Sequence, residues 1–331
     1  MAQIPLNPDL PSSYQVPGVY VYSSKAGLAS SASNRRVLLL GYKTSAGTAQ
    51  AGSIKRILSE DDVVRWAGKG SPLHRMYRDF TAQPESAAGE VYAMLLNAPS
   101  GTAQTRKIKV LELPTGAVLG STGTGAIAPG FWTLWICGKR FDCQVANGDT
   151  YATIAANMLA QIVAGQDELP CTAAVASETI TLTARVAALS SADMPFVSQF
   201  STEAMGLAAS CGTLTYASAA SGAGSTSLTV STLTASAAIS NLDAANAINA
   251  AMIVAINNAA AFSVRAAQPS TPGAVATLIC NDGCEINWVA TSITSTITTT
   301  LTVDVGANGS GLPSSATPSL ATVLSTLSSE D

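Results

Sequence analysis

RRVLLLGY, at residues 35–42, opens with two arginines and continues as an unbroken apolar run that closes at Gly41 and Tyr42. A run without polar alternation is typical of a strand that is buried on both faces of an α/β sheet. GEVYAMLLN, at 89–97, has the same character and predicts a second buried strand. The two stretches together predict the beginning of an α/β layer.

A helix is predicted directly before residue 68. LSEDDVVRWAGKG, at 58–70, offers Ser59 as the N-cap and Gly68 as the stop. Three acids, Glu60, Asp61 and Asp62, fill the first turn and suit the positive end of a helix dipole. This explanation needs no bound cation.

A second helix is predicted at 71–80, SPLHRMYRDF. Ser71 is its expected cap, and Pro72 stands at the first helical position. The helical spacing predicts an apolar face made of Leu73, Met76, Tyr77 and Phe80. The order strand, helix, helix, strand is half of an α/β layer.

The chain changes character after about residue 100. FWTLWICGKRFDCQV, at 131–145, predicts a hairpin that turns at Gly138-Lys139. NGDTYATIAANMLAQIVAGQ, at 147–166, predicts an amphipathic helix capped by Asp149. A strand pair is predicted at 171–175 and 178–186.

An approximate internal repeat indicates two related units. IAANMLAQI at 154–162 matches INAAMIVAI at 248–256, at an offset of 94 residues. Residues 100–310 are therefore predicted to hold two small α+β units. Strands are expected around the second helix at 227–233, 262–267 and 274–280, with one Thr-rich strand at 289–305.

The composition argues against a metabolic enzyme. Charged residues make up 11% of the 331 residues and aromatic residues 5%, a balance typical of virion-surface or secreted β-rich proteins. The net charge is −4, which makes nucleic acid an unfavourable partner. The sequence has no apolar stretch of about twenty residues and no signal-peptide pattern. We therefore expect synthesis in the cytoplasm and no membrane insertion.

We expect no catalytic, cofactor or metal site. His74 is the only histidine, and its spacing places it with Arg78 on the solvated side of the helix at 71–80. Most general-base and metal-hydrolase schemes need a second histidine. GSTGTG, at 120–125, lacks the Lys-Ser/Thr ending of a phosphate loop and reads as a flexible loop.

Six cysteines are compatible with buried free thiols or with disulfides. Cys280 and Cys284 flank Asn-Asp-Gly, and a three-residue hairpin loop there, with Gly283 left-handed, would make them disulfide partners. In the predicted hairpin at 131–145, Cys137 opposes Arg140 and Cys143 opposes Leu134. These two cysteines would then lie on opposite faces and need other partners if oxidised.

The first hundred residues resemble the contractile-tail sheath proteins of Mu-like bacteriophages. The resemblance is carried by LPSSYQVPGVYVYSSKAG (10–27), RRVLLLGY (35–42), WAGKGSPLHRMYRDF (66–80) and GEVYAMLLNAPSGTAQ (89–104). NGDTYATIAANML also fits a domain that the family inserts into its core. Family members run well beyond the position of Asp331, so the core would be completed by missing sequence or by a separate chain.

The resemblance implies a multidomain α+β and α/β protein. Its expected parts are an extended arm and donor strand (1–24), the first part of an α/β core (25–105), an inserted α+β subdomain (106–190), a second β-rich inserted subdomain (191–311) and a return helix (312–331).

A structural function follows from the resemblance. The chain is expected to polymerise as a helical sheath around a tail tube in the virion tail, after assembly in the host cytoplasm. Its partners would be other sheath subunits, the tail tube protein, the baseplate and the tail terminator. Strand pairing between subunits is expected at Pro17, Gly18, Val19, Tyr20, Val21 and Tyr22. The alternatives are pairing of this strand within its own domain, an R-type bacteriocin, and a tail-fibre or adhesin-like surface-binding module.

Overall fold

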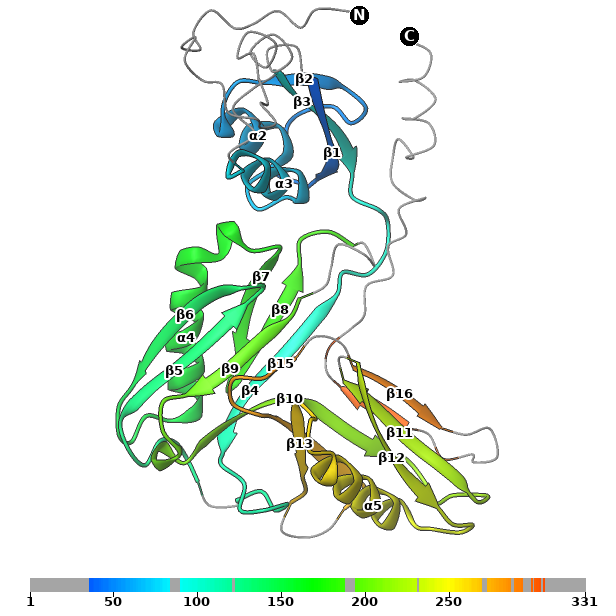
Figure 1. The fold of residues 1–331 in the computed structure, drawn as a ribbon. Helices are drawn as coiled ribbons and strands as arrows, with labels where there is room; N and C mark the ends of the chain where they lie inside the picture. Colours follow the sequence, from blue (N-terminus) through cyan, green and yellow to red (C-terminus); the bar gives the residue numbers. More distant parts are fainter. Residues whose placement is uncertain are drawn as a thin grey trace, which may run out of the picture.

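The computed structural model describes residues 36–83, 90–120, 123–187, 194–230, 232–269, 273–286, 289–293, 299, 301–304 and 306. These residues form a mixed α and β structure with several sheets. Figure 1 shows a small N-terminal unit, with β1 to β3, joined to a larger body by the segment that leads from β3 into β4.

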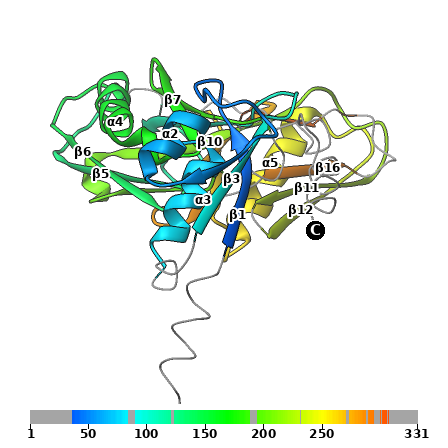
Figure 2. The same ribbon diagram turned by 90° about the horizontal axis from the view of Figure 1, so that it is seen from above.

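The N-terminal unit is built on the two predicted strands. β1 (Arg36–Lys43) pairs in parallel with β3 (Glu90–Asn97). The sequence did not predict β2 (Ile54–Ile57), a short strand with two basic residues that pairs antiparallel with the other edge of β3. Helices α2 (Glu60–Ala67) and α3 (Pro72–Thr81) lie on one side of β1 and β3, as Figure 2 shows.

Both predicted helix caps are confirmed. The hydroxyl of Ser59 accepts a hydrogen bond from the Asp62 N–H at 3.3 Å, and that of Ser71 accepts from the His74 N–H at 3.1 Å. A Cβ atom at Gly41 would lie 2.9 Å from Cβ of Leu73, which is fully buried. Gly41 therefore lets α3 pack closely on β1.

The larger body contains two copies of one arrangement. Each copy runs strand, hairpin, helix, hairpin, strand. The first comprises β4 (Thr105–Glu112), β5 (Gly130–Ile136), β6 (Lys139–Val145), α4 (Tyr151–Gly165), β7 (Cys171–Ala176), β8 (Thr179–Ala184) and β9 (Phe196–Phe200). The second comprises β10 (Leu207–Tyr216), β11 (Gly224–Val230), β12 (Leu233–Ile239), α5 (Ala245–Asn258), β13 (Val264–Ala267), β14 (Val275–Cys280) and β16 (Val289–Ile293).

The strand pairing repeats as well. β4 pairs with β8 as β10 pairs with β14, and β5 lies between β6 and β9 as β11 lies between β12 and β16. The helices α4 and α5 begin 94 residues apart, as do β5 and β11. β4 and β10 pair antiparallel, so the order β13-β14-β10-β4-β8-β7 is symmetric about their junction.

One hydrophobic core extends through both repeats. The residues that matched in the sequence, Ile154, Met158 and Ile162 in α4 and Ile248, Met252 and Ile256 in α5, are all buried within it. The residues that match between the two helices are therefore those with which each helix packs on its sheets. Four short elements complete the described structure: η2 (Gln166–Glu168), η3 (Glu203–Met205), β15 (Glu285–Ile286) and β17 (Leu301–Asp304).

Three local predictions in the repeats were wrong. The β5–β6 turn lies at Cys137-Gly138, because Ile136 pairs with Lys139, and Cys143 therefore faces Trp132 across the hairpin. Both turn residues have positive φ, at 50° and 81°. The N-cap of α4 is the hydroxyl of Thr150, whereas the carboxylate of Asp149 accepts from the Ala146 N–H at 2.7 Å.

Two stretches that were each predicted as one strand contain parts of two strands. The stretch 227–233 crosses the turn between β11 and β12. The Thr-rich stretch 289–305 holds two strands in different sheets, since β16 pairs with β11 and β17 with β10. Alternation alone did not show where one strand ends and the next begins.

Candidate functional site

The predicted pairing strand, from Pro17 to Tyr22, lies outside the described residues, as do the arm (1–24) and the return helix (312–331). Among the described residues, no cluster of three or more His, Cys, Asp or Glu side chains has the geometry to hold a metal ion. No described helix is both long and apolar enough to span a bilayer.

The hairpin expected between Cys280 and Cys284 does not form. Gly283 is left-handed, at φ 75°, as predicted. However, β14 before this turn pairs with β10 and β13, whereas β15 after it pairs with β9. Both thiols are free in the structure. The Cys280 thiol is hydrogen-bonded to Cys211, and this contact together with burial raises the pKa of Cys280.

His74 is buried, which corrects the prediction of a solvated side chain. It is 2% exposed, whereas Met76, predicted to lie on the apolar face, is 39% exposed. Nδ1 of His74 accepts from the Gly70 N–H at 3.1 Å, so Nε2 carries the proton in the neutral ring. Nε2 then donates to Oε1 of Glu60 at 2.9 Å. Glu60 thus joins α2 to α3 through this histidine.

The N-terminal unit contacts the first repeat through charged side chains. Nζ of Lys69 lies 2.7 Å from Oδ2 of Asp167, and this hydrogen bond lowers the pKa of Asp167. Glu168 lies 2.6 Å from Lys139 and 3.9 Å from Arg78. All of these side chains are partly solvent-exposed, so their ion pairs contribute little to stability.

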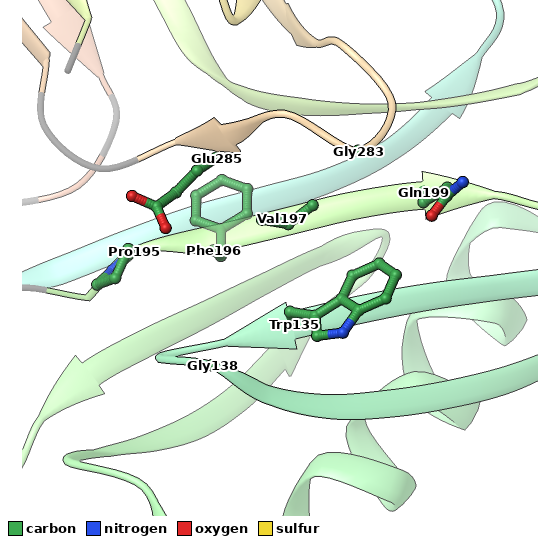
Figure 3. Close-up of a pocket in the computed structure, with 8 residues that line it drawn as sticks. All are labelled: Trp135, Gly138, Pro195, Phe196, Val197, Gln199, Gly283 and Glu285. Atoms are coloured by element: carbon green, nitrogen blue, oxygen red, sulfur yellow. The ribbon is translucent and has the colours of Figure 1, made fainter. Parts of the chain in front are cut away.

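Aromatic side chains gather on the outer face of the sheet β15-β9-β5-β6. Phe131 and Trp135 project from β5 on this face, and Phe131 is 52% exposed. Two shallow pockets share Trp135 and Gln199, with volumes of about 400 and about 510 Å³. Figure 3 shows the indole of Trp135 beside Val197 and Gln199 of β9, with Glu285 of β15 farther along the first pocket.

Polar groups line the second pocket in a fixed arrangement. Oδ1 of Asp142 accepts from the hydroxyl of Thr133 at 2.7 Å and from Nε of Arg140 at 2.9 Å. The hydrogen bond from Thr133, and then the contacts with Arg140, lower the pKa of Asp142. The Arg140 guanidinium lies 5.7 Å from the centre of the Trp135 ring, within cation–π range. We call Phe131, Thr133, Trp135, Arg140, Asp142 and Gln199 the aromatic face.

Comparison with known proteins relates part of the chain to one named structural protein. No family model matches the sequence. Over 180 residues, the chain is 31% identical to the Mu-like prophage FluMu tail sheath protein of Haemophilus influenzae. Part of this chain is related to a phage tail sheath protein. The match covers 54% of the chain and 34% of the relative, so the chain spans about a third of the length of the curated relative it matches.

Among solved structures, a match is found with the flagellar cap protein FliD from Helicobacter pylori. It has 8% sequence identity and a TM-score of 0.22, and covers 61% of this chain and 59% of that chain. A likeness this low supports no conclusion about fold or function.

The aromatic face was not predicted from the sequence. In FWTLWI, apolar residues occupy both faces of the strand, so alternation could not separate Trp132, which is fully buried, from Trp135, which is partly exposed. The signal that was available is the neighbouring β6, where Arg140, Asp142 and Gln144 alternate with buried residues and mark the outer side.

Proposed function

We propose that the protein is a structural subunit of a contractile phage tail sheath. It polymerises as a helical layer around the tail tube, and contraction of this layer drives the tube through the target envelope. The observation that carries the proposal is the relationship of 180 residues to a tail sheath protein. The activity is mechanical, so the proposal assigns no catalytic residue and no cofactor.

The N-terminal sheet supports the proposal because one of its faces keeps exposed apolar side chains. α2 and α3 cover the face that carries Leu39, Ala93 and Leu95. The other face is also apolar. Leu40, Tyr42, Met94 and Leu96 form a small cluster there, in which Met94 and Leu96 are buried, whereas Leu38 and Ile54 on the same face are 37% and 44% exposed. A sheet with a parallel pair normally has both faces covered. The proposed cover is further core sequence, from this chain or a separate one.

The edge of the same sheet supports strand exchange between subunits. Among the described strands, β1 pairs with β3 alone, and the proposal places a further strand on its second edge. The proposed donor is the strand from Pro17 to Tyr22 of a neighbouring subunit. Backbone pairing of this kind keeps subunits connected while they rotate about flexible linkers.

The remaining parts of the proposal concern placement and partners. The two repeats form outer domains that face away from the tube, and the N-terminal unit forms part of the lattice layer. The domain limits at 24, 105, 190 and 311 belong to this proposal. So do the tail tube protein, the baseplate and the tail terminator as partners, and the virion tail as the location.

Electron microscopy of the chain tests the proposal. The chain is expressed alone and with the products of the neighbouring reading frames, and both preparations are examined in negative stain. We expect hollow, striated tubes in the second preparation. Discrete monomers or trimers in both would overturn the sheath proposal and favour a surface-binding module.

Two variants test strand exchange separately. Val19→Pro combined with Val21→Pro removes two backbone N–H donors from the proposed donor strand, whereas alanine at both positions keeps them. We expect tubes from the alanine variant and none from the proline variant. Tubes of normal length from the proline variant would exclude this strand as the link between subunits.

A further inference from the structure

Because of the internal repeat, the outward residues of the aromatic face can be compared with those of a second hairpin in the same chain. Because β5 and β11 begin 94 residues apart, as do β6 and β12, each outward position of the first hairpin has a counterpart in the second. On the first strand, Phe131, Thr133 and Trp135 correspond to Ser225, Ser227 and Thr229. On the second strand, Arg140, Asp142 and Gln144 correspond to Thr234, Ser236 and Ala238.

The fold therefore does not require aromatic or charged residues at these positions. β11 and β12 form the same hairpin with Ser, Thr and Ala pointing outward, and β16 pairs with β11 as β9 pairs with β5. The inward positions are buried in both repeats. They hold Trp132 and Leu134 in the first repeat, and Thr226 and Leu228 in the second. Thr226, the polar residue among these four, hydrogen-bonds to the hydroxyl of Tyr216 at 3.1 Å. The outer surfaces of the two hairpins differ most, because the aromatic and charged residues of the first repeat are replaced by Ser, Thr and Ala in the second.

The pockets of the aromatic face are shallow, and their volumes match those of small-ligand sites. The two pockets, of about 400 and about 510 Å³, fall within the usual range for small-molecule sites of about 300–1,000 Å³. Trp135 lines both pockets. Each pocket thus offers an aromatic surface together with polar side chains, Gln199 in both, and Arg140 with Asp142 in the second.

The charges favour an uncharged, hydroxyl-rich ligand. In the second pocket Arg140 and Asp142 form an ion pair at 2.9 Å, so the two charges nearly cancel. In the first pocket the carboxylate of Glu285 disfavours an anionic ligand and can accept hydrogen bonds from hydroxyl groups. The Asp142 carboxylate keeps further lone pairs, and the Arg140 guanidinium has N–H donors besides the Nε–H that bonds to Asp142. Such groups match the alternating donors and acceptors of sugar hydroxyls, while the partly exposed indole of Trp135 suits the C–H-rich face of a pyranose ring.

We infer that the aromatic face is a carbohydrate-binding site for a neutral oligosaccharide about two rings long, with one ring in each of the two pockets. The site lies in the first repeat only. This inference does not rest on the sheath proposal, since it uses the geometry of the sheet and the comparison between repeats. For a sheath subunit it would provide a contact with glycans of the cell surface.

The test uses the full chain and two variants copied from the second repeat. Phe131→Ser and Trp135→Thr place on β5 the residues that β11 carries at the matched positions, so both variants are expected to fold. Thr229→Ala, on the corresponding strand of the second repeat, is the control. The proteins are applied to an array of neutral oligosaccharides, and binding of the retained sugars is then measured in solution by titration calorimetry.

We expect the wild type and Thr229→Ala to bind at least one neutral oligosaccharide with a Kd of about 1 mM or tighter. We expect Trp135→Thr to weaken binding at least tenfold and Phe131→Ser to weaken it less, because Phe131 contacts one pocket only. Circular dichroism and the melting temperature establish that both variants are folded. Absence of binding by the wild type, or equal binding by Trp135→Thr, would overturn the inference.

A protein partner is the competing occupant, because Trp and Arg are also frequent in protein interfaces. Light scattering of the same three proteins measures self-association. If Trp135→Thr abolishes self-association and no sugar binds, the aromatic face is a contact between copies of the chain and the carbohydrate inference is wrong.

Discussion

Gly148 and Leu242 occupy the same left-handed backbone position, one in each repeat. Their φ angles are 87° and 69°, and both lie in the turn that leads into a repeat helix. The Gly148 N–H donates to the carbonyl of Ala126 at 2.8 Å, and the Leu242 N–H donates to that of Ala220 at 3.0 Å. An aspartate follows each one, and its carboxylate caps the backbone N–H three residues earlier at 2.7 Å. The second repeat therefore keeps the turn with a residue that is poorly suited to it.

Replacing Leu242 by glycine is expected to stabilise the protein. A left-handed conformation costs a non-glycine residue about 1–2 kcal/mol, and Leu242 is 77% exposed, so little burial is lost. The greater freedom of glycine in the unfolded chain offsets about half of the gain. We expect the free energy of unfolding to rise by about 0.5–1 kcal/mol, measured by urea denaturation with far-ultraviolet circular dichroism.

The reciprocal change, Gly148→Leu, is the matched control. A Cβ atom at Gly148 would contact nothing within 4 Å, so any loss reflects backbone strain and not a clash. We expect a loss of about 1 kcal/mol. A loss of stability in Leu242→Gly together with a gain in Gly148→Leu would show that the turns are not equivalent in solution.

Local patterns predicted much of the fold, and long-range contacts account for what they missed. The strands β1 and β3, the helices α2 and α3 and the 94-residue repeat followed from apolar runs, caps and spacing. The pairing of β4 with β10 could not be predicted, because hydrogen bonds between strands so far apart leave no periodic signal. His74 was misplaced because its burial depends on Glu60 and the Gly70 N–H, which lie outside its own helix.

Removing the His74 side chain is expected to destabilise the N-terminal unit. His74→Ala leaves the buried Gly70 N–H without an acceptor, which costs about 1–3 kcal/mol, and also removes buried contacts. His74→Asn keeps an acceptor close to the position of Nδ1, so we expect it to lose about half as much. Both are measured by urea denaturation against the wild type. Equal losses would show that the hydrogen bond from Gly70 contributes little.

Glu178 is expected to make stability depend on pH in the acid range. The hydrogen bond from Ser177, and then that from Lys109, lower its pKa from 4.5 to about 2. A lowered pKa favours the folded state fully above pH 4.5, and this contribution is lost as the pH falls from 4.5 towards 2. Lys109 is about half-exposed, so solvent screening limits the contribution to less than about 1 kcal/mol.

The variant Glu178→Gln isolates this contribution. We expect it to be slightly less stable than the wild type at pH 7, with the difference shrinking between pH 4.5 and about 2. Urea midpoints at pH 7, 5 and 3.5 measure it, with Lys109→Met as the companion change that removes the cation. A difference that stays constant over these pH values would assign the effect to packing instead of ionisation.

Oxidation is expected to join Cys280 to Cys211 in preference to Cys284. The thiols of Cys280 and Cys211 are hydrogen-bonded in the core, and the Cys211 thiol lies 3.8 Å from the carbonyl oxygen of Leu278 on the strand that carries Cys280. Cys284 follows a turn and leads into another sheet. Because burial and a raised pKa slow the reaction of Cys280, treatment with diamide must be prolonged. Diamide takes up the two electrons and two protons released by a thiol pair, and peptide mass mapping identifies the disulfide. Cys284→Ser should leave the product unchanged, and Cys211→Ser should remove it. A Cys280–Cys284 product in the wild type would instead support the pairing predicted from the sequence and require the Asn281–Cys284 turn to rearrange.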